Sequence, residues 1–123
     1  MPVKSIEPTP TVLLVDGDEV QSLSSKRELE SQGYRVVCAH SGEDAFAAFE
    51  QEKIDAVVAD TLLPDMHVLD LIDGIAAKRR RIPIVVNSPY TVCNHNFRYW
   101  AADAIIEKSP DRHQLYAQVA ALL

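Results

Sequence analysis

The sequence has few of the residues on which several classes of protein depend. Its two cysteines, Cys38 and Cys93, are too few for a disulfide scaffold or a metal knuckle, and both read best as small buried hydrophobes. Its four glycines form no glycine-rich phosphate loop, which argues against a flavin or nucleotide binder. No internal repeat is visible either. The sequence therefore excludes small disulfide-rich and solenoid architectures.

Long apolar runs and positive charge are also scarce. The longest apolar stretches span a few residues, far short of a membrane-spanning helix, so we expect no membrane association. The N-terminus lacks the apolar core of a secretory signal, and a cytoplasmic location is the expectation. The formal net charge of −6 would repel a phosphate backbone, which argues against direct binding to nucleic acid.

A chain of 123 residues with 47% hydrophobic residues suits one domain with a real core. Residues 1–10 contain three prolines and no apolar periodicity, and are predicted to be a flexible leader. Residues 11–123 are predicted to form the domain.

Short aliphatic runs alternate with stretches of helical spacing along the domain. The runs are Thr11–Val15, Arg35–Ala39 and residues 54–59, 84–86 and 104–106. The helices are marked by Val20, Leu23 and Arg27 with Gly33 as a stop, by Ala45, Phe46 and Phe49 with Ser41 as a cap, by Leu69, Ile72, Ile75 and Ala76, and by Leu115, Val119 and Leu122. A further helix is predicted within residues 90–102. This alternation predicts a parallel sheet covered on both faces, a doubly wound α/β domain.

Polar residues collect where the predicted strands end. They are Asp16, Asp18 and Glu19 after the first strand, Asp60 after the third, Asn87 and Ser88 after the fourth, and Glu107 and Lys108 after the fifth. Ligands bind outside the carboxyl ends of such strands. Clustered carboxylates suit Mg²⁺, and a lysine and a hydroxyl suit a tetrahedral oxyanion. A carboxylate between them would be a nucleophile that forms an aspartyl phosphate.

Plainer interpretations of the same residues stay open. Asp60 would be a helix cap or a solvated loop carboxylate, and Asp16 and Lys108 would form a buried salt bridge without phosphate chemistry. His67 is expected at the surface, and His40 is expected to be a loop residue before the Ser41 cap.

The chain from about residue 11 to residue 123 resembles the receiver domain of bacterial response regulators. The resemblance rests on residues 12–16, residues 54–60 up to the acceptor, the Leu62-Leu63-Pro64-Asp65-Met66 loop, residues 83–88 and residues 102–108. It implies a flavodoxin-like (βα)₅ fold with a five-stranded parallel sheet in the order 2-1-3-4-5. It also implies a signalling phosphoacceptor rather than an enzyme.

The resemblance assigns a role to each matching residue. Asp60 would accept a phosphoryl group from a histidine kinase or a phosphotransfer protein. Mg²⁺ would be held by Asp16, Asp60 and the backbone carbonyl of Leu62, with Asp18 as a further candidate ligand. Ser88 and Lys108 would contact the phosphoryl oxygens. A downstream protein partner would bind the face formed by residues 90–123, and a homodimer is left open.

Several positions depart from the family pattern. Gly17 stands where a second acidic ligand is usual, which would weaken Mg²⁺ binding. Pro89 has no N–H to offer the phosphoryl group, and Ile105 replaces the aromatic switch residue. His67 and Val68 stand where an aspartate and a turn glycine are typical. The alternative function is therefore a pseudo-receiver, a constitutive interaction module that is not phosphorylated.

Three further positions bear on the geometry and lifetime of a phosphorylated form. Lys108 is followed by Ser109 instead of the proline common in the family, so the geometry of that peptide bond is left open. Leu62 and Tyr90 occupy the sites that tune attack by water, and neither can orient a hydrolytic water. The sequence therefore predicts slow autodephosphorylation.

Overall fold

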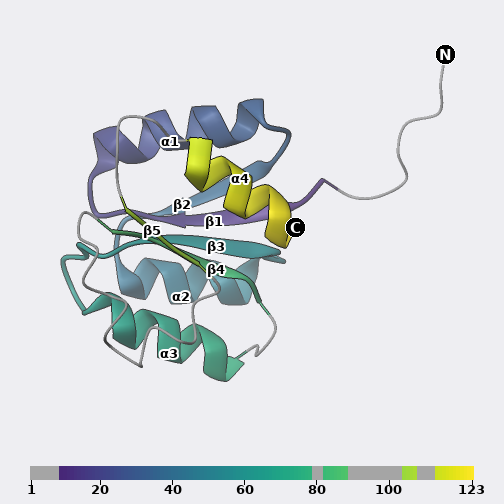
Figure 1. Cartoon of the computed structure of the whole chain (residues 1–123). Helices are drawn as coiled ribbons and strands as arrows, with labels where there is room; N and C mark the ends of the chain where they lie inside the picture. The colour runs from purple at the N-terminus through teal and green to yellow at the C-terminus, as the bar shows by residue number, and fades with distance from the viewer. Residues whose placement is uncertain (1–8, 79–81, 89–103, 108–112) are drawn as a thin grey trace, which may run out of the picture.

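The strands form one parallel sheet between two layers of helices. The computed structural model describes residues 9–78, 82–88, 104–107 and 113–123. The sheet has the order β2-β1-β3-β4-β5, with α1 and α4 over one face and α2 and α3 over the other (Figure 1). The strands are β1 (Thr11–Val15), β2 (Arg35–Ala39), β3 (Ala56–Asp60), β4 (Ile84–Ser88) and β5 (Ala104–Glu107), and the helices are α1 (Glu19–Ser31), α2 (Gly42–Gln51), α3 (Val68–Lys78) and α4 (His113–Leu122).

The predicted α/β class with a parallel, flavodoxin-like sheet is confirmed, including the strand order 2-1-3-4. The helix predicted within residues 90–102 and most of the predicted leader, residues 1–10, lie outside the described residues. Within the described ranges, no helix has both the length and the apolar character that crossing a membrane requires.

The two central strands supply the middle of the hydrophobic core. Every residue of β1 and β3 is buried, as the aliphatic composition of both runs predicts. Side chains alternate between the two faces of the sheet. Leu13 and Val15 therefore pack toward α2 and α3, whereas Val12 and Leu14 pack with Leu29 of α1 and the α4 residues Leu115 and Val119.

Helix α1 turns a different face to the sheet from the one that its apolar residues mark. Val20 is 82% exposed and Leu23 is 50% exposed, whereas Ser22, Ser25 and Leu29 are buried. The two small serines allow the helix to lie close to the strands, and Leu29 supplies the apolar anchor. The helix therefore leaves two large apolar side chains facing solvent.

The predicted helix boundaries are confirmed where the structure describes them. Gly33 ends α1 with a φ of 99°, and its N–H donates to the Glu30 carbonyl at 3.0 Å. Ser41 caps α2, because its hydroxyl accepts the Asp44 N–H at 3.0 Å. The predicted core residues Leu69, Ile72, Ile75, Leu115 and Val119 are all buried.

Candidate functional site

Asp16 and Asp60 emerge side by side at the carboxyl edge of the sheet. Asp60 is the last residue of β3, and Asp16 directly follows β1. These strands are neighbours, with Val15 in register with Ala59. The two strands therefore run about 5 Å apart at the residues just before the two aspartates. Asp16 is 4% exposed and Asp60 is 5% exposed. Two buried acidic residues thus lie on neighbouring strands at this edge of the sheet.

The next strands bring further polar residues to the same edge. Asn87 of β4 is in register with Asp60, and Ser88 is in register with Glu107 of β5. The backbone of Ser88 therefore lies at the edge that carries both carboxylates. Lys108 and Pro89 lie outside the described residues.

Backbone donors hold both carboxylates and the turn after β1. The Asp18 N–H donates to Oδ1 of Asp16 at 2.9 Å, and the Leu62 N–H donates to Oδ1 of Asp60 at 3.2 Å. Asp18 itself caps α1, because its Oδ1 accepts the N–H groups of Val20 and Gln21, each at 3.0 Å. One oxygen of this candidate metal ligand is therefore engaged in holding the helix.

Gly17 lies directly against the loop that follows β3. A Cβ atom at this position would stand 2.9 Å from the carbonyl oxygen of Leu62 and 3.4 Å from Cδ of Pro64. The first distance is shorter than a non-bonded carbon–oxygen contact allows. Because Gly17 has no side chain, the Leu62 carbonyl can lie next to the turn that follows β1.

The donors at this edge suit a hard divalent cation. Asp60, Gly17, Asp18 and Leu62 contribute to the lining of a pocket of about 400 Å³. In the part of the chain that the structure describes, no three His, Cys, Asp or Glu side chains are grouped for metal binding. The residues still fit Mg²⁺, because Asp16, Asp60 and the Leu62 carbonyl offer only oxygen and Mg²⁺ commonly keeps several waters.

Three large apolar side chains are exposed, one in the loop after β3 and two on α1. Leu62, which lines it, is 65% exposed. Val20 is in the first turn of α1, two residues after Asp18, which also lines the pocket. Leu23 lines a neighbouring groove between α1 and β2 together with His40. We call Val20, Leu23 and Leu62 the apolar rim of the site.

Sequence reasoning missed three contacts that shape the surrounding loops. Nδ1 of His40 lies 3.1 Å from the carbonyl oxygen of Asp16. The carboxylate of Asp65 accepts the N–H groups of Gly42 and Glu43 at 2.8 and 2.9 Å. These two hydrogen bonds lower the pKa of the Asp65 carboxyl below its ordinary value, because they favour the ionised form.

The third contact explains one departure from the family pattern. Nδ1 of His67 accepts the Leu69 N–H at 3.1 Å and so caps α3, a role that an aspartate could equally perform. The signal was its position immediately before the helix. His40 and Asp65 gave no such signal, because their partners are more than twenty residues away along the chain.

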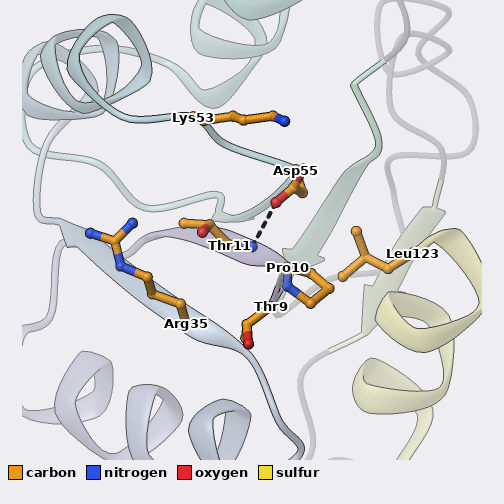
Figure 2. Close-up of a pocket in the computed structure, with 7 residues that line it drawn as sticks. All are labelled: Thr9, Pro10, Thr11, Arg35, Lys53, Asp55 and Leu123. Atoms are coloured by element: carbon orange, nitrogen blue, oxygen red, sulfur yellow. Dashed lines mark hydrogen bonds between the residues drawn. The ribbon is translucent and has the colours of Figure 1, made fainter. Parts of the chain in front are cut away.

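A second pocket, of about 480 Å³, lies at the amino edge of the sheet (Figure 2). Two of its charged residues, Asp55 and Arg35, make contacts that serve the fold. The Asp55 carboxylate accepts the Thr11 N–H at 2.8 Å, and Arg35 pairs with Glu52 at 2.9 Å. Because ligands of this type of sheet bind at the opposite edge, we assign the functional site to the pocket beside Asp60.

Comparison with known proteins agrees with the fold. Residues 12–120 match the model of the response regulator receiver domain. The chain therefore belongs to the response regulator receiver domain family. Such domains are signalling modules of two-component systems rather than classical enzymes.

Two curated relatives illustrate the similarity. The probable transcriptional regulatory protein TcrX of Mycobacterium tuberculosis is 32% identical over 76 residues, which is 62% of this chain and 32% of TcrX. The alkaline phosphatase synthesis transcriptional regulatory protein PhoP of Bacillus subtilis is 31% identical over 75 residues, which is 61% of this chain and 31% of PhoP. The matches therefore span about a third of each relative.

Two of the similar solved structures contain one protein, the response regulator TrrA of Thermotoga maritima. TrrA in complex with Mg²⁺ and BeF superposes with a TM-score of 0.90 at 28% identity, over 94% of this chain and 100% of TrrA. TrrA in complex with the histidine kinase ThkA gives a TM-score of 0.87 at 28% identity, over 94% of this chain and 99% of TrrA.

Proposed function

We propose that Asp60 is the phosphoacceptor of this receiver domain and that a histidine kinase or a phosphotransfer protein is its donor. The carrying observation is the pair of buried carboxylates, Asp16 and Asp60, on adjacent central strands beside a pocket. The complexes of TrrA with ThkA and with Mg²⁺ and BeF support the proposal from a relative with the same fold.

The transfer is a displacement at phosphorus. A carboxylate oxygen of Asp60 attacks the phosphorus of a phosphohistidine, the P–N bond breaks, and the imidazole leaves with its electron pair. The Leu62 N–H on Oδ1 orients the attacking carboxylate. Ser88 and Lys108 are proposed to contact the phosphoryl oxygens.

Mg²⁺, when bound, supplies the positive charge that the transferring phosphoryl group requires. Asp16, Asp60 and the Leu62 carbonyl would hold it. We propose that binding is weak, because Gly17 contributes no carboxylate and the Asp18 carboxylate is engaged at the start of α1.

The apolar rim is proposed as the docking surface for the phosphodonor protein. Leu62 is exposed at the mouth of the site and Val20 and Leu23 are exposed on α1, where burial against a partner would remove apolar surface from water. A downstream partner would use the face formed by residues 90–123.

We also propose that residues 11–123 form one (βα)₅ domain that acts in the cytoplasm, with residues 90–102 as the helix between β4 and β5.

Leu62 also bears on the lifetime of the aspartyl phosphate. Its side chain lines the pocket beside Asp60 and has no polar group that could orient an attacking water. We expect slow autodephosphorylation and, for Leu62→Asn, faster release of phosphate by roughly tenfold, below the 10²–10⁴-fold effect of a full general acid or base. Decay of the wild-type phosphoform within seconds would contradict this expectation.

The test of the phosphoacceptor role uses beryllofluoride as the phosphoryl mimic. Amide NMR spectra are recorded with and without beryllofluoride and Mg²⁺. We expect shifts that begin at Asp60 and extend to β4, β5 and the residues between them. Asp60→Asn should abolish the response, and Asp44→Asn, an exposed carboxylate on α2, should preserve it.

The second candidate is the pseudo-receiver, and the environment of Gly17 favours it. The Leu62 carbonyl fills the space that an acidic side chain would need, so the loops are packed for a site with fewer charged ligands. Wild-type spectra that do not respond to beryllofluoride and Mg²⁺ would favour this function over phosphorylation.

A further inference from the structure

Residues 40–43, which link β2 to α2 and include the first two residues of that helix, form a turn that contacts the loops beside both site carboxylates. On one side it reaches the acidic turn after β1. Nδ1 of His40 lies 3.1 Å from the Asp16 carbonyl oxygen, and because a carbonyl only accepts, Nδ1 donates in this contact. The Asp16 N–H donates to the Ala39 carbonyl at 2.9 Å. Both backbone polar groups of Asp16 are thus held by adjacent residues of β2 and the turn.

On its other side the turn holds the loop that follows Asp60. Oδ1 of Asp65 accepts the Gly42 N–H at 2.8 Å, and Oδ2 accepts the Glu43 N–H at 2.9 Å. The Met66 side chain packs so closely on Gly42 that no Cβ atom would fit between them. The loop is therefore fixed by two charge-assisted hydrogen bonds and one tight apolar contact.

These contacts matter because the pairing between β1 and β3 stops short of the two carboxylates. The register between β1 and β3 ends at Val15 and Ala59, one residue before each carboxylate. Beyond that pair, the position of Asp16 relative to the loop after Asp60 depends on what holds the two loops. The shared element is the turn at residues 40–43, which is bonded to one loop through His40 and to the other through Asp65.

We propose that this turn is a strut that sets the spacing of the Asp16 and Asp60 carboxylates, with His40 and Asp65 as its two positioning residues. The inference rests on the proposed function, because the spacing is important only if both carboxylates serve one bound group. Mg²⁺ demands near-ideal octahedral geometry, so small displacements of one ligand reduce affinity. His40 acts through Asp16, and Asp65 acts through the loop that follows Asp60. Neither residue touches a reacting atom.

The experiment measures Mg²⁺-dependent beryllofluoride binding by amide NMR titration at one fixed pH. His40→Leu removes the donor to Asp16, whereas His40→Asn keeps a side-chain N–H near the same place. Asp65→Ala removes both acceptors, and Asp65→Asn keeps one. We expect His40→Leu and Asp65→Ala each to weaken binding by roughly tenfold, as is typical for residues that orient metal ligands, and His40→Asn to restore most of the affinity.

Two control variants separate positioning from stability. Asp44→Asn removes a carboxylate from the same first turn of α2 without touching the acceptor loop, and should bind as the wild type does. Ile54→Val removes one methylene group from the core just before β3 and should lower the free energy of unfolding by about 1 kcal/mol while leaving both strut contacts in place. The amide shifts of Asp16 and Asp18 without Mg²⁺ should move in His40→Leu and stay in Ile54→Val.

The two proposals fail in different ways. A wild type that binds no beryllofluoride overturns the proposed function, and the strut with it. A wild type that binds, together with His40→Leu and Asp65→Ala variants that bind equally well or lose no more than Ile54→Val, overturns the strut alone. If the double variant loses less than the product of the single losses, the two residues act through one element, as the strut requires.

Discussion

Gly17 is the residue at which the packing of the site and its chemistry are most closely connected. Because a Cβ atom would stand 2.9 Å from the Leu62 carbonyl oxygen, Gly17→Ala must displace the loop that follows β3. We expect a loss of about 1–3 kcal/mol in the free energy of unfolding, the usual cost of overpacking, measured by urea denaturation. Ser24→Ala, at an exposed position of α1, should change stability by less than about 0.5 kcal/mol. Equal stabilities would show that the loop yields freely.

Individual site residues differ in how well the sequence predicts them. Asp16 and Asp60 could be identified because each ends an aliphatic run, and parallel strands bring such ends to one edge. The resemblance to receiver domains suggested their roles, which stay predictions. Asp65 and His40 could not be identified, because a hydrogen bond between distant loops leaves no local pattern.

The Asp65 carboxylate, which accepts two N–H groups at the start of α2, should make the stability of the protein depend on pH. The N–H groups of Gly42 and Glu43 lower the pKa of Asp65 from the ordinary value of 3.8. A carboxyl group whose pKa is lower in the folded state stabilises the fold above its unfolded pKa, and this contribution is lost as the pH falls through the folded pKa. We therefore expect the difference in unfolding free energy between wild type and Asp65→Asn to shrink as the pH falls below about 4.

Urea denaturation at a series of pH values measures that difference. Asp44→Asn is the matched variant, since Asp44 lies in the same turn and its backbone N–H, rather than its carboxylate, binds Ser41. Asp44→Asn leaves Asp65 and both of its hydrogen bonds in place, so this variant should keep the fall in stability that protonation of Asp65 causes. If the difference in unfolding free energy between wild type and Asp65→Asn stays constant down to low pH, the hydrogen bonds that Asp65 accepts do not depend on its charge.

Helix α1 shows why amphipathic patterns can mislead. Its large apolar residues Val20 and Leu23 indicated one face, but the helix packs through Ser22, Ser25 and Leu29. A helix beside a flat sheet gains contact when small residues allow close approach, and hydrophobicity alone does not report this. The exposed apolar face is then available for a partner. In the sequence, an apolar face that binds a partner looks the same as one that packs in the core.

The same helix gives a direct comparison of two leucines. Leu29 is fully buried and Leu23 is 50% exposed. Leu29→Ala should cost about 2–5 kcal/mol in the free energy of unfolding, because it leaves a cavity between α1 and the sheet. Leu23→Ala should cost less than about 0.5 kcal/mol in the same urea experiment. A large cost at Leu23 would show that its side chain packs in the core.

For the molecule as a whole, the alternation of aliphatic runs and helical stretches was sufficient to predict a parallel sheet covered on both faces. The strand order came from the resemblance to receiver domains, since periodicity does not determine which strands are neighbours. Strand ends were less accurate. β3 begins at Ala56 and includes Asp60, whereas the aliphatic pattern suggested residues 54–59. Ile54 is buried although it precedes the strand, so hydrophobicity overstated the start of the element.

Phosphoryl-mimic binding should stabilise the whole domain, because the site joins the two central strands of the sheet. A ligand that binds only the folded state raises the unfolding free energy by about 2.7 kcal/mol when its free concentration is roughly 100 times Kd. For a chain of this size we expect Tm to rise by about 10 °C with beryllofluoride and Mg²⁺ together. Either component alone should give little change, because the proposed function has both carboxylates serve one bound group. Asp60→Asn should abolish the rise while the parent fold persists, and an equal rise in that variant would place the binding somewhere other than between β1 and β3.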